Sequence, residues 1–201
     1  LDTCGFEKDS FYFYQSIWRR EEPMAHLLPH WNLDVPEGTI VPVLGYTSCD
    51  SAELFLNGKS YGKKAYSYPS YGMTERYGHF DRDPEPVNTD DLFLSWDVPY
   101  EPGCIELVGY KDGKEAARHT VRTAGKPAVI RTAGYRSEAK ADGLDVAQIE
   151  VWLEDAEGNF CPQGDLPLTF SVKGPAELTG VDNGDPEEKG SLRGDRMRAF
   201  H

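Results

Sequence analysis

The sequence lacks the long apolar runs and the positive charge that two large classes of protein need. No stretch of its 201 residues approaches the roughly 20 consecutive apolar residues that cross a bilayer as a helix. Acidic residues outnumber basic ones by 34 to 21, and the formal net charge is −13 at pH 7. Because a surface of this sign repels phosphate groups, we expect neither nucleic acid nor membrane as a partner.

Cysteine is scarce, and its spacing fits no metal or redox motif. The four residues, Cys4, Cys49, Cys104 and Cys161, stand far apart and form no C-x-x-C pair. We expect four free, buried thiols. A disulfide between Cys49 and Cys104 is the alternative, if both fall on facing strands. The cysteines therefore leave the compartment open, either periplasmic or secreted, or cytoplasmic, in a bacterium.

The sequence also lacks a complete set of metal ligands. His26 and His30 have the spacing of zinc ligands on a helix, but Pro29 between them disfavours that helix. The acidic stretches 81–91 and 182–185 do not follow the ligand order of an EF-hand. We expect structural histidines, solvated acidic loops, and neither a metal nor a cofactor.

No catalytic group stands out either. Residues 58–62 match G-x-S-x-G, but that motif places a nucleophile only where a strand turns sharply into a helix. Here the serine follows Asn57-Gly58, a strong hairpin signal. Glycoside hydrolysis needs two carboxylates facing each other from rigid elements, about 5–5.5 Å apart in retaining enzymes. Nothing in these loops is so placed, and we expect no catalytic residue.

An aromatic helix is predicted near the start of the chain, over residues 11–18. Asp9 or Ser10 can cap it, and Arg19 and Arg20 suit its C-terminal dipole. Apolar or aromatic groups fall on almost every side, which is typical of a helix buried between two layers. Because nothing later in the chain predicts a second helical layer, we interpret it as an orphan helix. The packing partners that it needs are expected in a larger enzyme.

From residue 39 onward the apolar period changes to two, and the prediction becomes mainly β. Strands every eight to twelve residues with turns between them indicate an immunoglobulin-like β-sandwich. Pro42 in the first of these strands predicts an edge position or a bulge. The expected strands are residues 40–44, 53–56, 59–61, 92–98, 105–109 and 117–121.

A second set of strands follows a linker at residues 123–127. It covers residues 146–153, 166–172, 178–181 and the end of the chain from residue 198. This set is shorter than the about 100 residues that such a sandwich needs, so we expect a truncated second sandwich. The predicted domains are 1–23 for the helical segment, 24–124 for the first sandwich and 125–201 for the second.

Tyrosines crowd the stretch 61–80. Tyr66, Tyr68 and Tyr71, together with Trp31, offer flat faces with polar tips that can stack on sugar rings. These four residues are the candidate carbohydrate contacts. The alternative is that the tyrosines clamp a long loop onto its own sandwich.

The opening eighteen residues resemble the end of the catalytic barrel in family 2 glycoside hydrolases, the β-galactosidase group. There a segment similar to D-x-C-G-F-P-K-D leads from the last barrel strand into an aromatic last helix. Glu7 replaces the usual proline. The matching residues are Asp2, Cys4, Gly5, Phe6, Lys8 and Asp9. Further stretches resemble the immunoglobulin-like and invasin-like domains that follow the barrel: HLLPHWN, CDSAELFLNGKS, WDVPYEPG, GYKDGK, ADGLDVAQIEVWLEDAEGNF and GVDNGDP.

This resemblance implies a non-catalytic C-terminal fragment of a retaining β-galactosidase-like enzyme. The fragment would consist of one orphan helix from a catalytic (β/α)8 barrel followed by two β-sandwiches, and its partner would be that barrel. In such enzymes the acid/base glutamate follows an asparagine, and a second glutamate is the nucleophile. No asparagine here precedes a glutamate, so no catalytic residue carries over. Two alternatives remain, a carbohydrate-binding module that uses the tyrosine-rich loop and an adhesin-type array of sandwiches on a cell surface.

Overall fold

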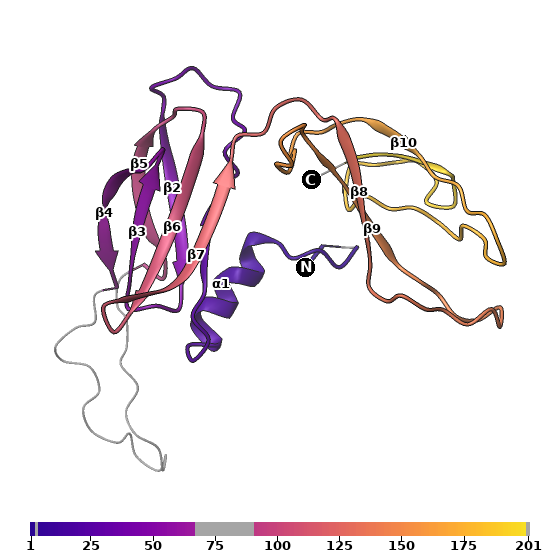
Figure 1. Ribbon diagram of the computed structural model, residues 1–201, viewed down its shortest axis with the longest axis horizontal. Coiled ribbons are helices and arrows are strands. Elements are labelled where there is room, and N and C mark those ends of the chain that lie inside the picture. Colours follow the sequence, from indigo (N-terminus) through magenta and orange to yellow (C-terminus); the bar gives the residue numbers. More distant parts are fainter. Residues whose placement is uncertain (3, 67–90, 200–201) are drawn as a thin grey trace, which may run out of the picture. The chain divides into compact units, whose positions relative to one another are not determined.

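The computed structural model describes residues 1–2, 4–66 and 91–199, and in them the chain is mainly β with one helix, α1 (Asp9–Trp18) (Figure 1). The chain divides into two compact units. One unit is Glu7–Val121. The other consists of Arg122–His201 together with the short segment Leu1–Phe6. The predicted segment 1–23 is thus shared between them.

The unit Glu7–Val121 is a sandwich of two antiparallel sheets, which confirms the predicted fold class. One sheet has the order β1-β2-β5 and the other β4-β3-β6-β7. Their bounds are β1 (Ala25–Leu28), β2 (Ile40–Thr47), β3 (Ser51–Leu56), β4 (Lys59–Ala65), β5 (Leu94–Pro99), β6 (Cys104–Lys111) and β7 (Lys114–Arg122). The burial of β5 alternates strictly along the strand, so Leu94, Trp96 and Val98 face the core while the residues between them face solvent.

The hairpin between β3 and β4 forms where the sequence predicts it. Asn57 and Gly58 both have positive φ, 50° and 79°, as a two-residue type I′ turn requires. Asn57 also holds the turn before β6, since its Oδ1 accepts the Cys104 N–H at 2.8 Å and its Nδ2 donates to the Pro102 carbonyl at 3.2 Å. One side chain therefore ties two neighbouring turns together.

β2 is central in its sheet and is not an edge strand over its whole length, but the expected edge position holds at Pro42 itself. The proline is therefore placed where it costs little. β1 pairs only with the later half of β2, from Leu44 to Thr47, whereas Pro42 pairs with Asp97 of β5. Among the described residues this half of β2 pairs on one side only, with β5, and the missing N–H of a proline is tolerated there.

Helix α1 lies beside the sandwich and packs on β1 and β2 (Figure 1). The Phe13 ring meets the Tyr46 ring edge-on, with centroids 5.4 Å apart. The chain itself therefore supplies one of the two layers that the aromatic pattern predicts, a correction to the interpretation as an orphan. The capping prediction is also wrong, because the N-cap residue is Lys8, which makes no side-chain cap, and Asp9 lies inside the first turn.

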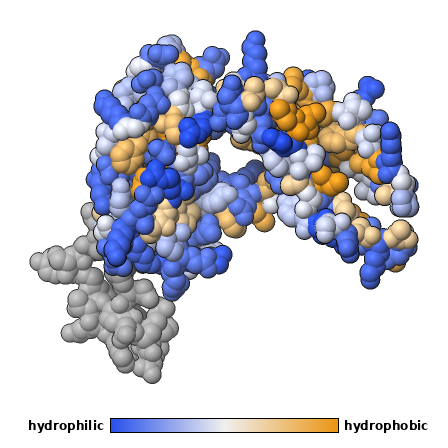
Figure 2. Space-filling model, in the orientation of Figure 1, coloured by the Kyte–Doolittle hydropathy of each residue, from blue (hydrophilic) through white to orange (hydrophobic). Residues whose placement is uncertain are grey.

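The second unit has a much smaller core. It contains two antiparallel pairs, β8 (Val129–Gly134) with β9 (Ile149–Glu154) and β10 (Pro167–Thr169) with β11 (Arg196–Arg198). Among its described residues the buried apolar side chains are Leu153, Cys161 and Met197, and many large apolar side chains stay exposed. Figure 2 shows strongly hydrophobic surface on this unit.

The strand predictions for this unit hold only in part. β9 begins three residues later and ends one residue later than the predicted stretch 146–153, and β10 is a short piece of the stretch 166–172. β11 ends where a strand from residue 198 was expected to begin. Residues 178–181 form no strand, although the Val181 N–H donates to the Leu192 carbonyl. β8 is missed by the sequence because all six of its residues are exposed, so it carries no alternating apolar pattern.

The side chain of Asp155 binds backbone groups of two separate segments at the start of this unit, where the apolar core is small. Its carboxylate is 2 % exposed and accepts four hydrogen bonds. Oδ2 accepts the Gly125 N–H at 2.8 Å and the Asn159 side-chain amide at 3.0 Å, while Oδ1 accepts the backbone N–H groups of Glu157 and Asn159 at 3.0 and 2.7 Å. These bonds, led by that of the Asn159 side chain, lower the pKa of Asp155 to about 2. The predicted linker is thus fastened at Gly125 to the turn after β9.

We predict that Asp155→Ala lowers the melting temperature of the second unit, because it leaves three backbone N–H groups without their acceptor. The folded-state pKa lies below the ordinary value, so the charged carboxylate stabilises the fold above about pH 4. This contribution is lost as the pH falls through about 2. Calorimetric scans should therefore show the largest difference from wild type at pH 7 and a shrinking one below pH 4. Glu138→Ala, which removes an exposed carboxylate of the same unit, is the control. An equal effect of both changes would contradict the role of Asp155.

Candidate functional site

The contact between α1 and the sandwich is a column of three stacked rings. Tyr12 of α1 lies on His26 of β1 with ring centroids 3.9 Å apart and planes 8° apart. His26 in turn lies on His119 of β7, with centroids 4.8 Å apart and planes at 15°. Since β1 and β7 belong to different sheets, the column joins the helix to both layers of the sandwich.

Hydrogen bonds fix each ring of this column. His26 Nε2 lies 2.8 Å from Asp9 Oδ1, and the Tyr12 hydroxyl donates to Glu7 Oε2 at 2.6 Å. The backbone N–H of Leu27 donates to His119 Nδ1 at 2.9 Å. This last bond requires that His119 carry no proton on Nδ1.

The environment of the column shifts two pKa values. Burial, followed by the positive charge that His26 can carry, lowers the pKa of His119 to about 4. Burial and then the hydrogen bond to Glu7 raise the pKa of Tyr12 to about 12. At neutral pH both side chains are therefore uncharged, which suits their stacked, half-buried positions.

The opposite face of α1 presents two aromatic side chains to solvent. Tyr14 is 49 % exposed and Trp18 is 75 % exposed. The two residues are four positions apart, so they share one face of the helix, and their ring centroids are 4.8 Å apart. We call Tyr14 and Trp18 the outer aromatic pair. The two rings form a small apolar patch on the surface of the helix.

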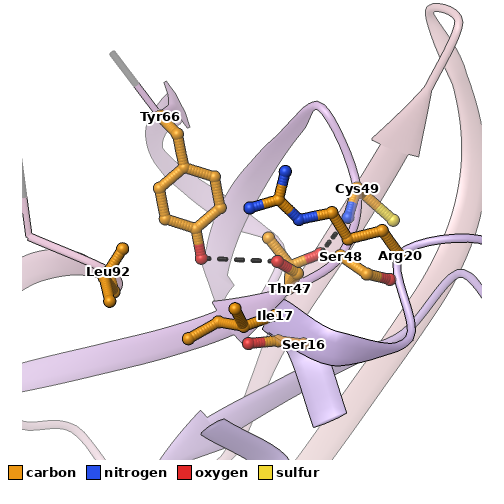
Figure 3. A pocket seen from close by; sticks show the side chains of 8 residues that line it. All are labelled: Ser16, Ile17, Arg20, Thr47, Ser48, Cys49, Tyr66 and Leu92. Atoms are coloured by element: carbon orange, nitrogen blue, oxygen red, sulfur yellow. Dashed lines mark hydrogen bonds between the residues drawn. The ribbon is translucent and has the colours of Figure 1, made fainter. Parts of the chain in front are cut away.

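A small hollow lies between the end of α1 and the turn after β2 (Figure 3). Its volume of about 40 Å³ holds one or two water molecules, whereas sites for small organic ligands measure several hundred Å³. Its buried hydroxyls already donate to backbone carbonyls, that of Ser16 to Phe13 and that of Thr47 to Met24. The lining residues are Ser16, Ile17, Arg20, Thr47, Ser48, Cys49, Tyr66 and Leu92. We assign no ligand to it.

The structure describes two of the four predicted carbohydrate contacts, Trp31 and Tyr66. Trp31 is 0 % exposed and its indole N–H donates to the Glu101 carbonyl at 2.9 Å, so it is a core residue and offers no face to a sugar. This corrects the prediction for Trp31. Tyr66 is half-buried against the core, and its hydroxyl donates to the Thr47 carbonyl at 3.4 Å. Tyr68 and Tyr71 lie outside the described residues, and their role remains a prediction.

The other sequence candidates have structural roles. Ser60 of the G-x-S-x-G match lies on a hairpin strand and donates to Glu53 Oε1 at 2.6 Å. His30 Nδ1 accepts the Asn32 N–H at 3.2 Å. The acidic stretch 81–91 lies outside the described residues except for Asp91.

None of the four cysteines forms a disulfide, so the alternative of a disulfide between Cys49 and Cys104 is wrong. Cys49 and Cys161 are buried as expected, but Cys4 and Cys104 are only half-buried. Within the described ranges no three histidine, cysteine or carboxylate groups come together as metal ligands. The same ranges contain no helix that is long and apolar enough to cross a membrane.

The column of Tyr12, His26 and His119 is the feature that sequence reasoning missed. Two of its members lie in predicted elements, but residues 12 and 119 are far apart in the chain and nothing in their spacing links them. The nearest signal is the alternation of Ala117, His119 and Val121, which correctly places the histidine on the inward side of its strand.

The architecture defines the class of the protein as a β-sandwich protein with a helix packed on one sandwich. Residues 130–201 match the family model described as glycoside hydrolase family 2 C-terminal domain 5. Residues 38–117 match a domain model of unknown function. The chain belongs to the C-terminal region of the glycoside hydrolase family 2 proteins.

Bacteroides and Formosa proteins are among its relatives. The chain is 35 % identical over 201 residues to a β-galactosidase of Bacteroides ovatus, all of this chain against 21 % of that protein. It is 29 % identical over 195 residues to a β-glucuronidase of Formosa agariphila, covering 18 % of it. The crystal structure of a β-glycosidase from Bacteroides vulgatus superposes with a TM-score of 0.83 at 36 % identity, over all of this chain and 23 % of that one. The chain thus spans about a fifth of the length of these relatives.

We predict that the sandwich loses stability between pH 7 and pH 5 because of His119. Its folded-state pKa lies below the ordinary value of 6.5, so protons bind the unfolded chain more readily, and stability falls as the pH drops from about 6.5 towards 4. From the two pKa values the loss by pH 5 is about 2 kcal/mol. Urea unfolding followed by tryptophan fluorescence at pH 7 and pH 5 measures it.

The matched variant for this prediction is His119→Asn. Asparagine keeps an acceptor oxygen for the Leu27 N–H but cannot take up a proton in this range. Its free energy of unfolding should change less than that of wild type over the same interval. The other titratable groups at the column, Tyr12, His26 and the Asp9 carboxylate bonded to His26, are unaltered in this comparison. Equal losses in both proteins would exclude His119 as the source.

Proposed function

We propose that this chain is the non-catalytic C-terminal region of a longer, retaining β-galactosidase-like glycoside hydrolase, and that it is structurally accessory to the catalytic barrel. Its close relation to a β-galactosidase and a β-glycosidase at 35 and 36 % identity supports this proposal. The resemblance of the opening residues to the end of a catalytic barrel points to that barrel as the partner.

The main structural support for this proposal is the outer aromatic pair. Tyr14 and Trp18 form the face of α1 that the sandwich leaves uncovered, while the column of Tyr12, His26 and His119 fixes the opposite face. Tyrosine and tryptophan dominate the energetics of protein interfaces because each buries about 150–250 Å² of ring surface. We propose that these two rings pack against the catalytic barrel, so that one helix connects the sandwich to it.

We predict that Trp18→Ala has little effect on the stability of the chain alone but destabilises the full-length enzyme. In the chain alone the side chain is exposed, and the free energy of unfolding should change by no more than about 0.5 kcal/mol. In the full-length enzyme the same change should weaken docking by about 2–4 kcal/mol, the range of an interface hot spot. Thermal unfolding of both proteins gives the comparison.

Ile40→Ala is the matched control for this experiment. Ile40 is 59 % exposed on β2 of the same unit but does not belong to α1. It should be neutral in both proteins. If Trp18→Ala is neutral in the full-length enzyme as well, the outer aromatic pair is not the docking surface.

We also predict that the purified chain does not hydrolyse nitrophenyl β-galactoside, whereas the full-length enzyme does. The reason is that none of its glutamates follows an asparagine, the arrangement expected for the acid/base residue. A colorimetric assay at matched protein concentration tests this. Turnover by the chain clearly above the blank would refute the non-catalytic role.

A further inference from the structure

Asp2, Cys4, Gly5 and Phe6, which precede the helix in the chain, belong to a turn that is held by the Asp2 carboxylate. Asp2 Oδ1 accepts the backbone N–H groups of Cys4 and Phe6 at 2.9 and 2.8 Å, and the Asp2 N–H donates to the Phe6 carbonyl at 3.0 Å. Gly5 has a φ of +91°, which closes the turn. Although this turn leads directly into α1, it belongs to the compact unit built from Arg122–His201.

The partner of the turn is the loop at residues 182–185, which we call the DNGD loop. The loop is organised by its own side chains, because Asp182 Oδ1 accepts the Gly184 N–H and Asn183 Oδ1 accepts the Asp185 N–H, each at 3.1 Å. Asn183 Nδ2 also donates to the Arg198 carbonyl at 3.1 Å, so the loop is tied to β11. These bonds, within the loop and to β11, define the shape of the loop without using any atom of the turn.

Gly184 is the point of contact. It is buried, with a φ of +72°, and a Cβ atom built on it would lie 2.5 Å from Asp2 Oδ2 and 3.7 Å from Cys4 Sγ. A side chain at this position would have to displace the Asp2 carboxylate, whose other oxygen holds the turn. The absence of a side chain thus lets the backbone of the DNGD loop approach the Asp2 carboxylate and the Cys4 thiol closely.

We propose that the DNGD loop is a docking site for the turn of residues 2–6, and that through it the C-terminal unit positions the loop that follows the last strand of the catalytic barrel. The second half of this inference rests on the proposed function, in which the opening residues come from that barrel. In such barrels the loops that follow the strands form the rim of the active site. The DNGD residues would then act as positioning residues, 180 positions away in sequence from the segment that they hold.

The docking itself can be tested on the chain alone with Gly184→Ala and Gly143→Ala. Both glycines have nearly the same positive φ, +72° and +76°, so alanine is strained equally at both, but a Cβ at Gly143 would meet nothing within 4 Å. The readout is the alkylation rate of the Cys4 thiol, followed by peptide mass spectrometry. We expect Gly184→Ala to raise this rate by about fivefold or more through local opening, and Gly143→Ala to change it by less than about twofold.

Two other thiols are internal controls in the same samples. Cys161, buried in the same unit, reports whether that unit stays folded, and Cys104 reports on the sandwich. Should Gly184→Ala expose Cys161, Asn183→Ala provides the second variant, because it loosens the loop without touching Asp2 or Cys4. An unchanged Cys4 rate in the folded variants would overturn the docking site.

The positioning role is tested in the full-length enzyme by steady-state hydrolysis of nitrophenyl β-galactoside. We expect Gly184→Ala to raise KM severalfold with a smaller change in kcat, and Gly143→Ala to leave both unchanged. If Cys4 is released but KM and kcat stay at wild-type values, the positioning role is wrong. A wild-type full-length enzyme without activity would instead count against the proposed function, and the thiol experiment would still decide the docking site.

Discussion

The stack of Tyr12 on His26 and His119 is the interaction on which the arrangement of the first unit depends. A ten-residue helix is too short to be stable alone in water, so α1 persists because its inner face is packed. The packing combines ring stacking with the bond from the Leu27 N–H to His119, which exists only while that imidazole nitrogen is unprotonated. Once the inner face is fixed, the direction of the outer aromatic pair is fixed as well.

Membership of glycoside hydrolase family 2 indicates a purpose for this arrangement of the helix. The relatives are about five times longer than the chain, and the chain corresponds to a C-terminal portion of them. An aromatic helix with one face on a sandwich and one face open is suited to join two folded bodies. The sequence of α1 carries apolar residues on nearly all sides for this reason, since each face has a different partner in our proposal.

The two units are stabilised by different means. Of the eighteen buried apolar residues in the described part of the chain, fifteen belong to the first unit and three to the second. The second unit relies instead on side chains that bind backbone groups, as Asp155 does at Gly125 and as Asn183 does at β11. Such turns have defined shapes and keep backbone near the surface, which explains why a docking site is found on a loop of this unit rather than on a sheet.

The sequence by itself determined the features that depend on neighbours in the chain: the Asn57-Gly58 hairpin, the alternation of β5, the helix at the start and the class of the fold. These follow because turn geometry and the two-residue strand period are local. Only the tertiary structure decided that Trp31 is a core residue, that His119 stacks on His26 and that β8 exists with every residue exposed. Each of these depends on which distant strands come together, and a packed layer can bury a ring or pair a strand without leaving any local pattern in the sequence.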